Sequence, residues 1–350
     1  MQGERKHRLA GEDYWQAIDE LCTAVKTVWP EALLQFEDFE TMHAFEILQR
    51  FRTRLLCYND DIQGTGAVVT AGVINGLRLQ NTEPGKLRLV MFGAGSSAVG
   101  VAEAIAAYLE EKASMSRKCA RQAIYLVDSK GLVTSSRGDA LPAHKQLFAR
   151  EPDETSFPGN IKNLKDIIAA IKPHALVGLS AAGPSWTKEV ILELCTHVEK
   201  PLIFPLSNPT DKAEITAEEA YEWSNGKAIF AAGSPFDPVE VNGKLHVPGQ
   251  ANNVFIFPGM GFGSVMSKSN TVTDAMFAAA AEALARCTDE EHLQRGELYP
   301  PMSSLRLVST KIAAAVAQKA WQEGNSKLNE EPEDWEGYIK GLQWWPAKDF

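Results

Sequence analysis

Cysteine is scarce in this sequence, and no two cysteines have the spacing of a metal-binding motif. The five cysteines stand far apart, at Cys22, Cys57, Cys119, Cys195 and Cys287. A zinc site or a disulfide framework is therefore not expected, and a reducing environment inside the cell fits this pattern better. Long apolar runs are also absent. No stretch approaches the roughly 18 apolar residues of a membrane span.

A signal peptide and an excess of basic residues are missing as well. The first fifteen residues lack an apolar centre, so we expect a cytoplasmic protein, with an organelle left open. The net charge is −10 and the isoelectric point is near 5.3. Nucleic acid and membrane surfaces need a basic protein face, so neither is expected as a partner. With 350 residues, of which 45% are apolar, the chain can build a large core, and its length suggests two domains.

Apolar runs that fit strands alternate with stretches that fit helices, which is typical of an α/β fold with a largely parallel sheet. Each of the later apolar runs leads into a polar or Gly/Pro-rich loop, as a ligand crevice at the carboxyl ends of parallel strands requires. The expected strands are 33–36, 55–58, 87–92, 123–127, 175–179, 202–206, 228–231 and 254–257. The expected helices are 11–28, 41–54, 66–79, 99–111, 275–286 and 305–323.

A glycine-rich loop follows the strand expected at 87–92 and precedes a helix. In this loop Gly93 permits a tight turn, Gly95 lets the backbone approach a pyrophosphate, and Ala98 is small enough for close packing of helix on strand. Backbone amides at the start of the helix would face the phosphates. Asp128, which ends the next strand, lies 33 residues after Gly95, and a long crossover accommodates this spacing. We predict a dinucleotide site here; the alternative is a purely structural turn.

Two acidic pairs, Glu37-Asp38 and Asp60-Asp61, each follow a short apolar run. Solvated charge at strand ends is the ordinary interpretation of such pairs. Large apolar neighbours surround both, however, and buried carboxylates are costly without a cation. Because the seven histidines are scattered, we expect Mg²⁺ or Mn²⁺ held by oxygen atoms rather than zinc. The amides of Asn208, Asn252 and Asn253 could bind a substrate carboxylate or could equally cap turns.

Eight segments together resemble the malic enzymes over nearly the whole chain. They are QFEDF, YNDDIQGTGAV, FGAGSSAVG, LVDSKGLV, LSNPT, AAGSPF, PGQANNVFIFPG and LYPPMSSLR, in this order. The resemblance is to the C-terminal two-thirds of that family, whose members oxidise malate with NAD(P), decarboxylate the product and release pyruvate with the help of Mg²⁺ or Mn²⁺. It implies a homo-oligomer, a dimer or a tetramer, with malate as the substrate.

The resemblance also implies roles for individual residues. The metal ligands would be Glu37, Asp38 and Asp61, and Asp60 would interact with the family's catalytic lysine. Malate and the nicotinamide would lie against Asn208, Asn252 and Asn253. The coenzyme would contact Thr65, Gly93, Gly95, Ser96, Ser97, Ala98, Asp128, Ser129, Lys145 and Asn208.

Coenzyme preference is expected to depend on the region after Asp128. Members that prefer NADP resemble this chain in having a serine next, here Ser129, and a lysine 17 residues after the aspartate, here Lys145. A 2′-phosphate beside a carboxylate needs a compensating cation, which Lys145 could supply with help from Lys130 or Arg137. NADP is therefore preferred over NAD. The alternative is that Lys145 is one more exposed lysine.

The family's tyrosine general acid, its malate-binding arginine and its lysine general base precede the region that this chain matches. The resemblance therefore implies a Rossmann-type dinucleotide-binding domain at 62–253 and an incomplete substrate and metal domain built from 1–61 and 254–324, with a loosely held or interfacial tail at 325–350. We expect malic enzyme chemistry, impaired without these groups. The alternatives are a noncatalytic dinucleotide-binding or assembly module and, less favoured, a dehydrogenase of another 2-hydroxy acid.

Overall fold

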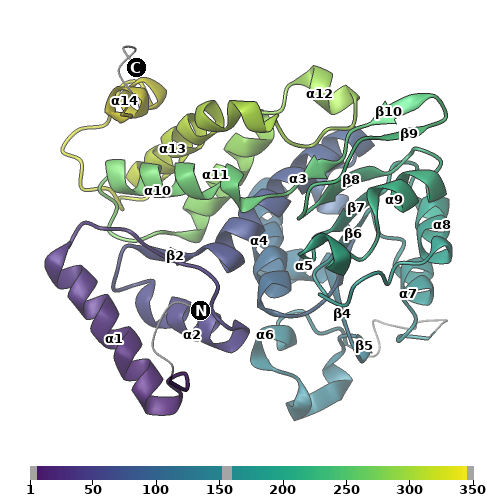
Figure 1. The fold of residues 1–350 in the computed structure, drawn as a ribbon, viewed down its shortest axis with the longest axis horizontal. Coiled ribbons are helices and arrows are strands. Elements are labelled where there is room, and N and C mark those ends of the chain that lie inside the picture. The colour runs from purple at the N-terminus through teal and green to yellow at the C-terminus, as the bar shows by residue number, and fades with distance from the viewer. Residues whose placement is uncertain (1–5, 152–159, 345–350) are drawn as a thin grey trace.

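A seven-stranded sheet forms the centre of the structure, a computed structural model that describes residues 6–151 and 160–344 (Figure 1). The strand order is β11-β8-β7-β6-β3-β4-β5, and all neighbours are parallel except β4 and β5. The first strand of this sheet along the chain is β3. The next two, β4 and β5, lie on one side of β3, and the later strands β6, β7, β8 and β11 lie on the other side. The predicted doubly wound α/β fold is therefore confirmed. The strands are β3 (Leu89–Phe92), β4 (Ile124–Asp128), β5 (Gly131–Leu132), β6 (Ala175–Gly178), β7 (Leu202–Pro205), β8 (Ile229–Ala232) and β11 (Gly249–Gln250).

Helices bury both faces of this sheet, which explains why its strands are apolar without alternation. Successive side chains of a strand point to opposite faces, so Leu89 and Met91 join one core cluster and Val90 joins the other. The first face packs on α3 (Thr65–Gln80) and α4 (Ser96–Lys112), and the second on α7 (Leu164–Ile171), α8 (Lys188–His197) and α9 (Ala217–Trp223). Two short helices, α5 (Arg117–Gln122) and α6 (Ala143–Gln146), flank β4 and β5.

The two ends of the chain lie beside each other at the side of this sheet (Figure 1). From the amino-terminal end come α1 (Gly11–Val28), α2 (Thr41–Phe51) and the parallel pair β1 (Leu34–Phe36) and β2 (Cys57–Asn59). From the other end come α10 (Phe257–Met266), α11 (Asp274–Arg286), α12 (Glu290–Gln294), α13 (Leu305–Gln322) and α14 (Trp335–Leu342). The Arg52 guanidinium pairs with Asp274 at 2.7 Å, and the ring of Tyr58 packs edge-on against Phe277. A hairpin of β9 (Val239–Val241) and β10 (Lys244–His246) precedes β11.

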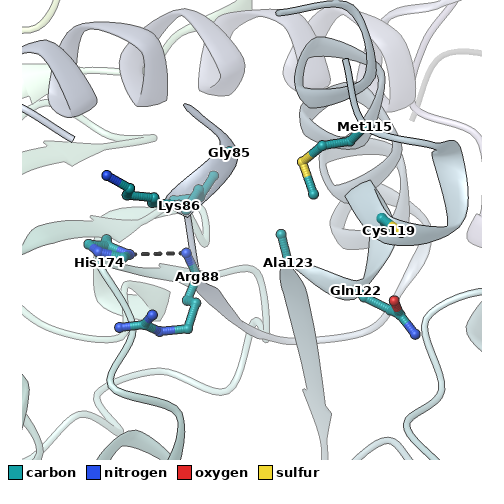
Figure 2. Close-up of a pocket in the computed structure, with 9 residues that line it drawn as sticks. Gly85, Lys86, Arg88, Met115, Cys119, Gln122, Ala123 and His174 are labelled. Carbon is teal, nitrogen blue, oxygen red and sulfur yellow. Dashed lines mark hydrogen bonds between the residues drawn. The ribbon is translucent and has the colours of Figure 1, made fainter. Parts of the chain in front are cut away.

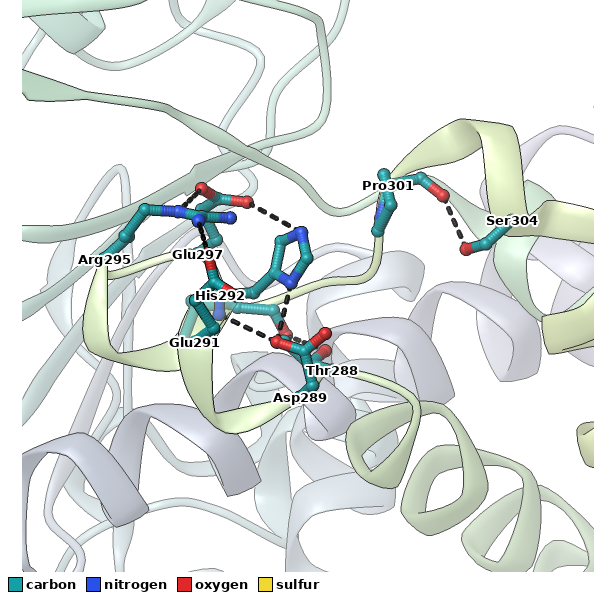
Figure 3. Close-up of polar contacts among 9 residues, drawn as sticks. Thr288, Asp289, Glu291, His292, Arg295, Glu297, Pro301 and Ser304 are labelled. Carbon is teal, nitrogen blue, oxygen red and sulfur yellow. Dashed lines mark hydrogen bonds and ion pairs between the residues drawn. The ribbon is translucent and has the colours of Figure 1, made fainter.

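The loop around α12 is held by a surface network of charged side chains (Figure 3). Asp289 accepts hydrogen bonds from the backbone and the ring of His292, at 2.9 and 2.7 Å, and Arg295 bridges Glu291 and Glu297 at 2.8 Å each. These pairs fix the connection between α11 and α13. Because most of their carboxylates are exposed, we assign them a local structural role.

One expected strand was wrong, and the tail is not loosely held at α14, while its alternative role at an interface stays a prediction. The apolar run 254–257 is not a strand: Asn253–Phe255 is a 3-10 turn that leads into α10, and the Asn252 side chain caps it by accepting from Val254 N at 2.9 Å. A four-residue apolar run fits a buried strand and a buried helix equally well, and the cap decides for the helix. The sheet instead ends with β11. In the tail, α14 is not loosely held, because Ile339 and Trp335 are buried against α13.

Candidate functional site

The glycine loop between β3 and α4 has the geometry of a phosphate loop. Gly93 has φ of +124°, and its N–H donates to Val127 O at 2.8 Å. A Cβ at Gly93 would lie 2.4 Å from Leu179 O, so only glycine fits. Gly95, by contrast, is exposed, and a Cβ there would meet no atom within 4 Å. The loop is thus tightly packed at Gly93 and open at Gly95, and an open backbone is what the approach of a pyrophosphate requires.

The other residues predicted around this loop lie at helix starts. Ser96 and Ser97 form the first turn of α4, and Thr65 is the first residue of α3. Ala98 is buried in the core between helix and sheet. The two helices approach closely where a Cβ at Gly66 would come within 2.9 Å of Ala104. The first turn of α4 lies at the carboxyl end of β3, beside β6, where the strand order reverses and where a doubly wound sheet binds its ligand.

Asp128, the last residue of β4, is held by two cations. Arg137 donates to both carboxylate oxygens at 2.8 and 2.9 Å, and Lys145 donates to one of them at 2.9 Å. Burial alone would raise the pKa of Asp128, but the hydrogen bonds from Arg137 and Lys145 outweigh it and lower the pKa. Lys145 is thus not an ordinary exposed lysine, and two positive charges meet one negative charge here. The neighbouring Ser129 is exposed.

Asn208 lies in the loop after β7 and is joined to the loop after β8. Its Oδ1 accepts from Ser234 Oγ at 2.6 Å, and the Asn208–Pro209 peptide bond is cis. A Cβ at Gly233 would come within 2.9 Å of Asn208 Nδ2. Asn208 is nevertheless exposed on its other side. A carboxamide held in place and open to solvent at a strand end can donate to a bound ligand.

Of the four acidic residues predicted at the metal site, only Asp60 is fully buried. It begins the π-helical turn Asp60–Gly64, and a Cβ at Gly64 would collide with its carboxylate, at 2.0 Å from Oδ1. Asn253 Nδ2 donates to Oδ2, while Oδ1 is buried without a hydrogen-bond partner. Burial and the neighbouring carboxylates of Glu37 and Asp61 together raise the pKa of Asp60 to about 7, although the hydrogen bond from Asn253 lowers it.

The three predicted metal ligands come near one another but do not form a set of ligands in this structure. Asp38, at φ of +60°, donates its N–H to Asp61 Oδ2 at 2.8 Å, and Glu37 accepts from Gln35 at 3.0 Å. Glu37 and Asp38 are exposed, so the prediction that apolar neighbours bury both pairs was wrong. Within 6–151 and 160–344, no three His, Cys, Asp or Glu side chains are arranged to hold a metal ion.

Asn252 and Asn253 have different roles in the structure. Asn252 caps a turn through its Oδ1, as the alternative interpretation predicted, and its amide nitrogen is not used in that bond. Asn253 links the turn before α10 to Asp60 across 193 residues of sequence. Asn253 therefore brings the carboxyl-terminal segment to the acidic cluster, and Asn252 sets the direction of the chain next to it.

One residue of the site was missed by sequence reasoning. Glu214 lies between β7 and α9, is fully buried, and accepts three hydrogen bonds from Ser180 and Ser207 in the loops after β6 and β7. In the sequence it stands two residues before the helix cap Thr216, where an acidic residue is unremarkable. Nothing local distinguishes it, because its partners are 34 and 7 residues away.

A cavity of about 500 Å³ lies at the end of the sheet opposite the glycine loop (Figure 2). Arg88, Ala123 and His174, which directly precede β3, β4 and β6, are among its lining residues. It is therefore at the amino ends of the parallel strands, and none of the predicted site residues lines it. His174 Nδ1 accepts from Arg88 N at 3.0 Å, and the Arg88 side chain donates to Lys172 O. These polar groups already have partners, and we assign the cavity no ligand.

The fold and the crevice define a dinucleotide-binding α/β protein, and comparison with known proteins identifies the family. The family model "Malic enzyme, NAD binding domain" matches residues 62–321, and "Malic enzyme, N-terminal domain" matches residues 1–52. The chain belongs to the malic enzyme family, which confirms the resemblance seen in the sequence. In the described part of the chain, none of the helices has the combination of length and apolarity needed to cross a membrane.

Relatives and solved structures agree with this assignment. The NADP-dependent malic enzyme of Dictyostelium discoideum is 43% identical over 99% of this chain and 63% of its own length; that of Populus trichocarpa is 44% identical over 99% and 58%. The chain thus spans about three-fifths of the length of these relatives. The crystal structure of Entamoeba histolytica malic enzyme has a TM-score of 0.75 at 24% identity, covering 93% of this chain and 61% of that one. The Pyrococcus horikoshii malic enzyme has a TM-score of 0.73 at 25% identity, covering 93% and 69%.

Proposed function

We propose that this chain binds NADP and takes part in the oxidative decarboxylation of malate to pyruvate and CO2. The family supports an oxidoreductase of this kind, and relatives named NADP-dependent malic enzyme support the coenzyme. The observation that carries the proposal is the pairing of Asp128 with Arg137 and Lys145 at the end of β4.

The charge balance at Asp128 favours NADP over NAD. A strand-end carboxylate in this position ordinarily accepts the ribose 2′-hydroxyl and repels a 2′-phosphate. Here two cations face one carboxylate, so the cluster has a net charge of +1, and all three side chains are mostly buried. Lys145 uses one of its three N–H donors on Asp128, which leaves two for a phosphate.

Replacing Lys145 by Gln tests the coenzyme assignment. We expect the variant to bind NADPH about tenfold more weakly while its affinity for NADH changes little, because only NADPH has the 2′-phosphate. Isothermal titration calorimetry with both coenzymes measures this. The matched control is Lys118→Gln, which removes an exposed lysine of α5, before β4. An equal loss for both coenzymes in the Lys145 variant would refute the assignment.

We further propose that Glu37, Asp38 and Asp61 hold a divalent metal ion, Mg²⁺ or Mn²⁺. Carboxylate oxygens are the ligands that such ions prefer, and Asp60, whose buried Oδ1 has no hydrogen-bond partner among the described residues, lies near the negative charges of Glu37 and Asp61. When bound, the ion would act as a Lewis acid toward the malate C2 oxygen. The three side chains do not form a ligand set in the structure, so binding would require them to reorient.

Residues of this chain would position malate, and one of them would help to hold the group that removes the proton from the C2 hydroxyl. Oxidation of malate removes a hydride from C2 and a proton from the C2 hydroxyl, and loss of CO2 then leaves C3 to be protonated. Asn208 and Asn252 would donate to malate and to the nicotinamide carboxamide. Asp60, whose Oδ2 accepts from Asn253 and whose Oδ1 has no hydrogen-bond partner among the described residues, would interact with the family's catalytic lysine, the group that takes the hydroxyl proton.

Metal binding can be tested separately from catalysis. Asp61→Ala should lower the affinity for Mn²⁺, because it removes one of three carboxylates, and calorimetry in the absence of malate measures this directly. The control is Asp211→Ala, which removes an exposed carboxylate in the loop after β7. Equal Mn²⁺ affinity in the two variants and the original chain would exclude Asp61 as a ligand.

A second candidate is a noncatalytic dinucleotide-binding or assembly module. The absence of a preformed ligand set among the described carboxylates favours it. Pyruvate formation from malate, NADP and Mn²⁺ decides between the two functions. If the purified chain binds NADPH but forms no pyruvate, the module is supported and the enzymatic proposal fails for this chain. Assembly into a homo-oligomer and a cytoplasmic location remain predictions; three relatives are named chloroplastic.

A further inference from the structure

The loops after β6 and β7 meet at one buried carboxylate. Ser180 donates its N–H and its Oγ–H to Glu214 Oε1, at 3.0 and 2.8 Å, and Ser207 Oγ donates to the same oxygen at 2.5 Å. Glu214 itself is fully buried. Three donors from two separate loops thus converge on a single oxygen atom, which is a strong arrangement only if the acceptor is a carboxylate.

The two serines extend this junction into the backbone of the first loop. Ser207 Oγ accepts from Ala181 N at 2.9 Å, and Ser180 Oγ accepts from Ala182 N at 3.2 Å. Each hydroxyl therefore donates to Glu214 and accepts from a backbone N–H, so the two serines connect the loop 180–183 to Glu214. Glycine at 178 leaves room for the Glu214 carboxylate, because a Cβ at Gly178 would lie 2.4 Å from Cδ of Glu214.

The junction holds the residue that would contact the nicotinamide. Asn208 directly follows Ser207, and its side chain is fixed from the other direction by Ser234. In a doubly wound sheet a dinucleotide lies across the point where the strand order reverses, here between β3 and β6. Its adenosine half lies toward β4, which ends at Asp128, so its nicotinamide half lies toward β6 and β7 (Figure 1). Glu214 thus lies on the nicotinamide side of the crevice.

We propose that Glu214 is a positioning residue that ties the loops after β6 and β7 together and so fixes Asn208 against the nicotinamide half of the coenzyme. This inference rests on the proposed binding of NADP. It does not depend on malate turnover or on the metal ion.

Glu214→Gln tests the proposal with two ligands that differ in the nicotinamide half. The neutral amide oxygen of Gln accepts hydrogen bonds more weakly than a carboxylate oxygen, so the three donors should be held less firmly and one loop should lose its anchor. We expect NADPH to bind about tenfold more weakly or worse. Adenosine 2′,5′-bisphosphate, which has the 2′-phosphate but no nicotinamide, should bind within about twofold of the original chain, because its contacts lie near Asp128. Calorimetry measures both affinities.

The control is Glu218→Gln, the same substitution at an exposed glutamate of α9, which should change neither affinity. If Glu214→Gln weakens both ligands alike, its role is general stability and the proposal is overturned. It is also overturned if NADPH binds as before. If Glu214→Gln does not fold, Ser207→Ala, which removes one donor and leaves the carboxylate, should show the same selective loss, and its failure to do so counts against the proposal. An original chain that binds neither ligand refutes the proposed function instead.

Discussion

Alanine at Gly93 and alanine at Gly95 should have opposite consequences, although the two positions belong to one loop. At Gly93 the φ of +124° is a conformation that side chains rarely adopt, which costs about 1–3 kcal/mol. The new Cβ would lie 2.4 Å from Leu179 O and 2.6 Å from Leu179 C, both backbone atoms that cannot rotate away, and such overpacking costs about 1–3 kcal/mol more. We expect Gly93→Ala to lower the free energy of unfolding by about 2–6 kcal/mol.

At Gly95 the same substitution should leave the fold intact. Its φ of −78° and ψ of −171° suit alanine, and the Cβ would meet no protein atom within 4 Å. Restricting the unfolded chain should even raise the free energy of unfolding, by at most about 1 kcal/mol. The empty space in front of Gly95 is where a pyrophosphate would approach, so we expect NADPH affinity to fall about tenfold or more.

Urea denaturation followed by tryptophan fluorescence measures the first effect, and calorimetry with NADPH measures the second. Each variant is the control for the other. The reasoning is refuted if Gly93→Ala unfolds within about 0.5 kcal/mol of the original chain, which lies inside the ordinary range of neutral substitutions. It is also refuted if Gly95→Ala binds NADPH with unchanged affinity.

Three further predictions concern stability. Asn75→Ala should lower the free energy of unfolding by about 2 kcal/mol or more in urea denaturation, since the buried amide donates to two backbone carbonyls beyond α3; an unchanged midpoint would contradict this. Trp335→Ala should release α14 and speed its cleavage by trypsin while NADPH affinity stays the same; equal cleavage rates would mean that Trp335 does not hold this helix. Burial and the Arg88 guanidinium lower the pKa of His174 from 6.5, so the unfolded chain binds the proton more tightly. The contribution of neutral His174 to the free energy of unfolding is complete above about pH 6.5 and is lost as the pH falls from there through the folded pKa. His174→Gln should therefore lose less free energy of unfolding between about pH 7.5 and pH 5.5 than the original chain. An equal loss in both proteins would show that His174 does not cause this pH dependence.

The main elements of the sheet could be predicted because each depends on nearby residues. Seven expected strands lie within two residues of β1, β2, β3, β4, β6, β7 and β8. Five of these, β3, β4, β6, β7 and β8, belong to the central sheet, where a strand covered on both faces must be apolar throughout. The phosphate loop was recognisable for a similar reason. A turn that needs φ above zero at one residue and an exposed backbone at another selects glycine at both, here Gly93 and Gly95.

The acidic residues show where such reasoning ends. Four carboxylates in two similar sequence contexts looked alike, yet the structure buries Asp60 completely and leaves Glu37 and Asp38 exposed. Burial depends on what the rest of the chain places over a residue, here Asn253 and the turn before α10. The same is true of Lys145, whose pairing with Asp128 is a contact over 17 residues.

The sequence by itself determined the family, the doubly wound sheet and the glycine loop, because these depend on local periodicity, on the steric freedom of glycine and on short motifs. Only the tertiary structure decided that Glu214 joins two strand-end loops, that Asn253 donates to Asp60, and that 254–257 is helical. Each of these depends on hydrogen bonds or packing that form after distant segments meet. The energy of such contacts is not encoded near any one residue, so no local pattern could reveal them.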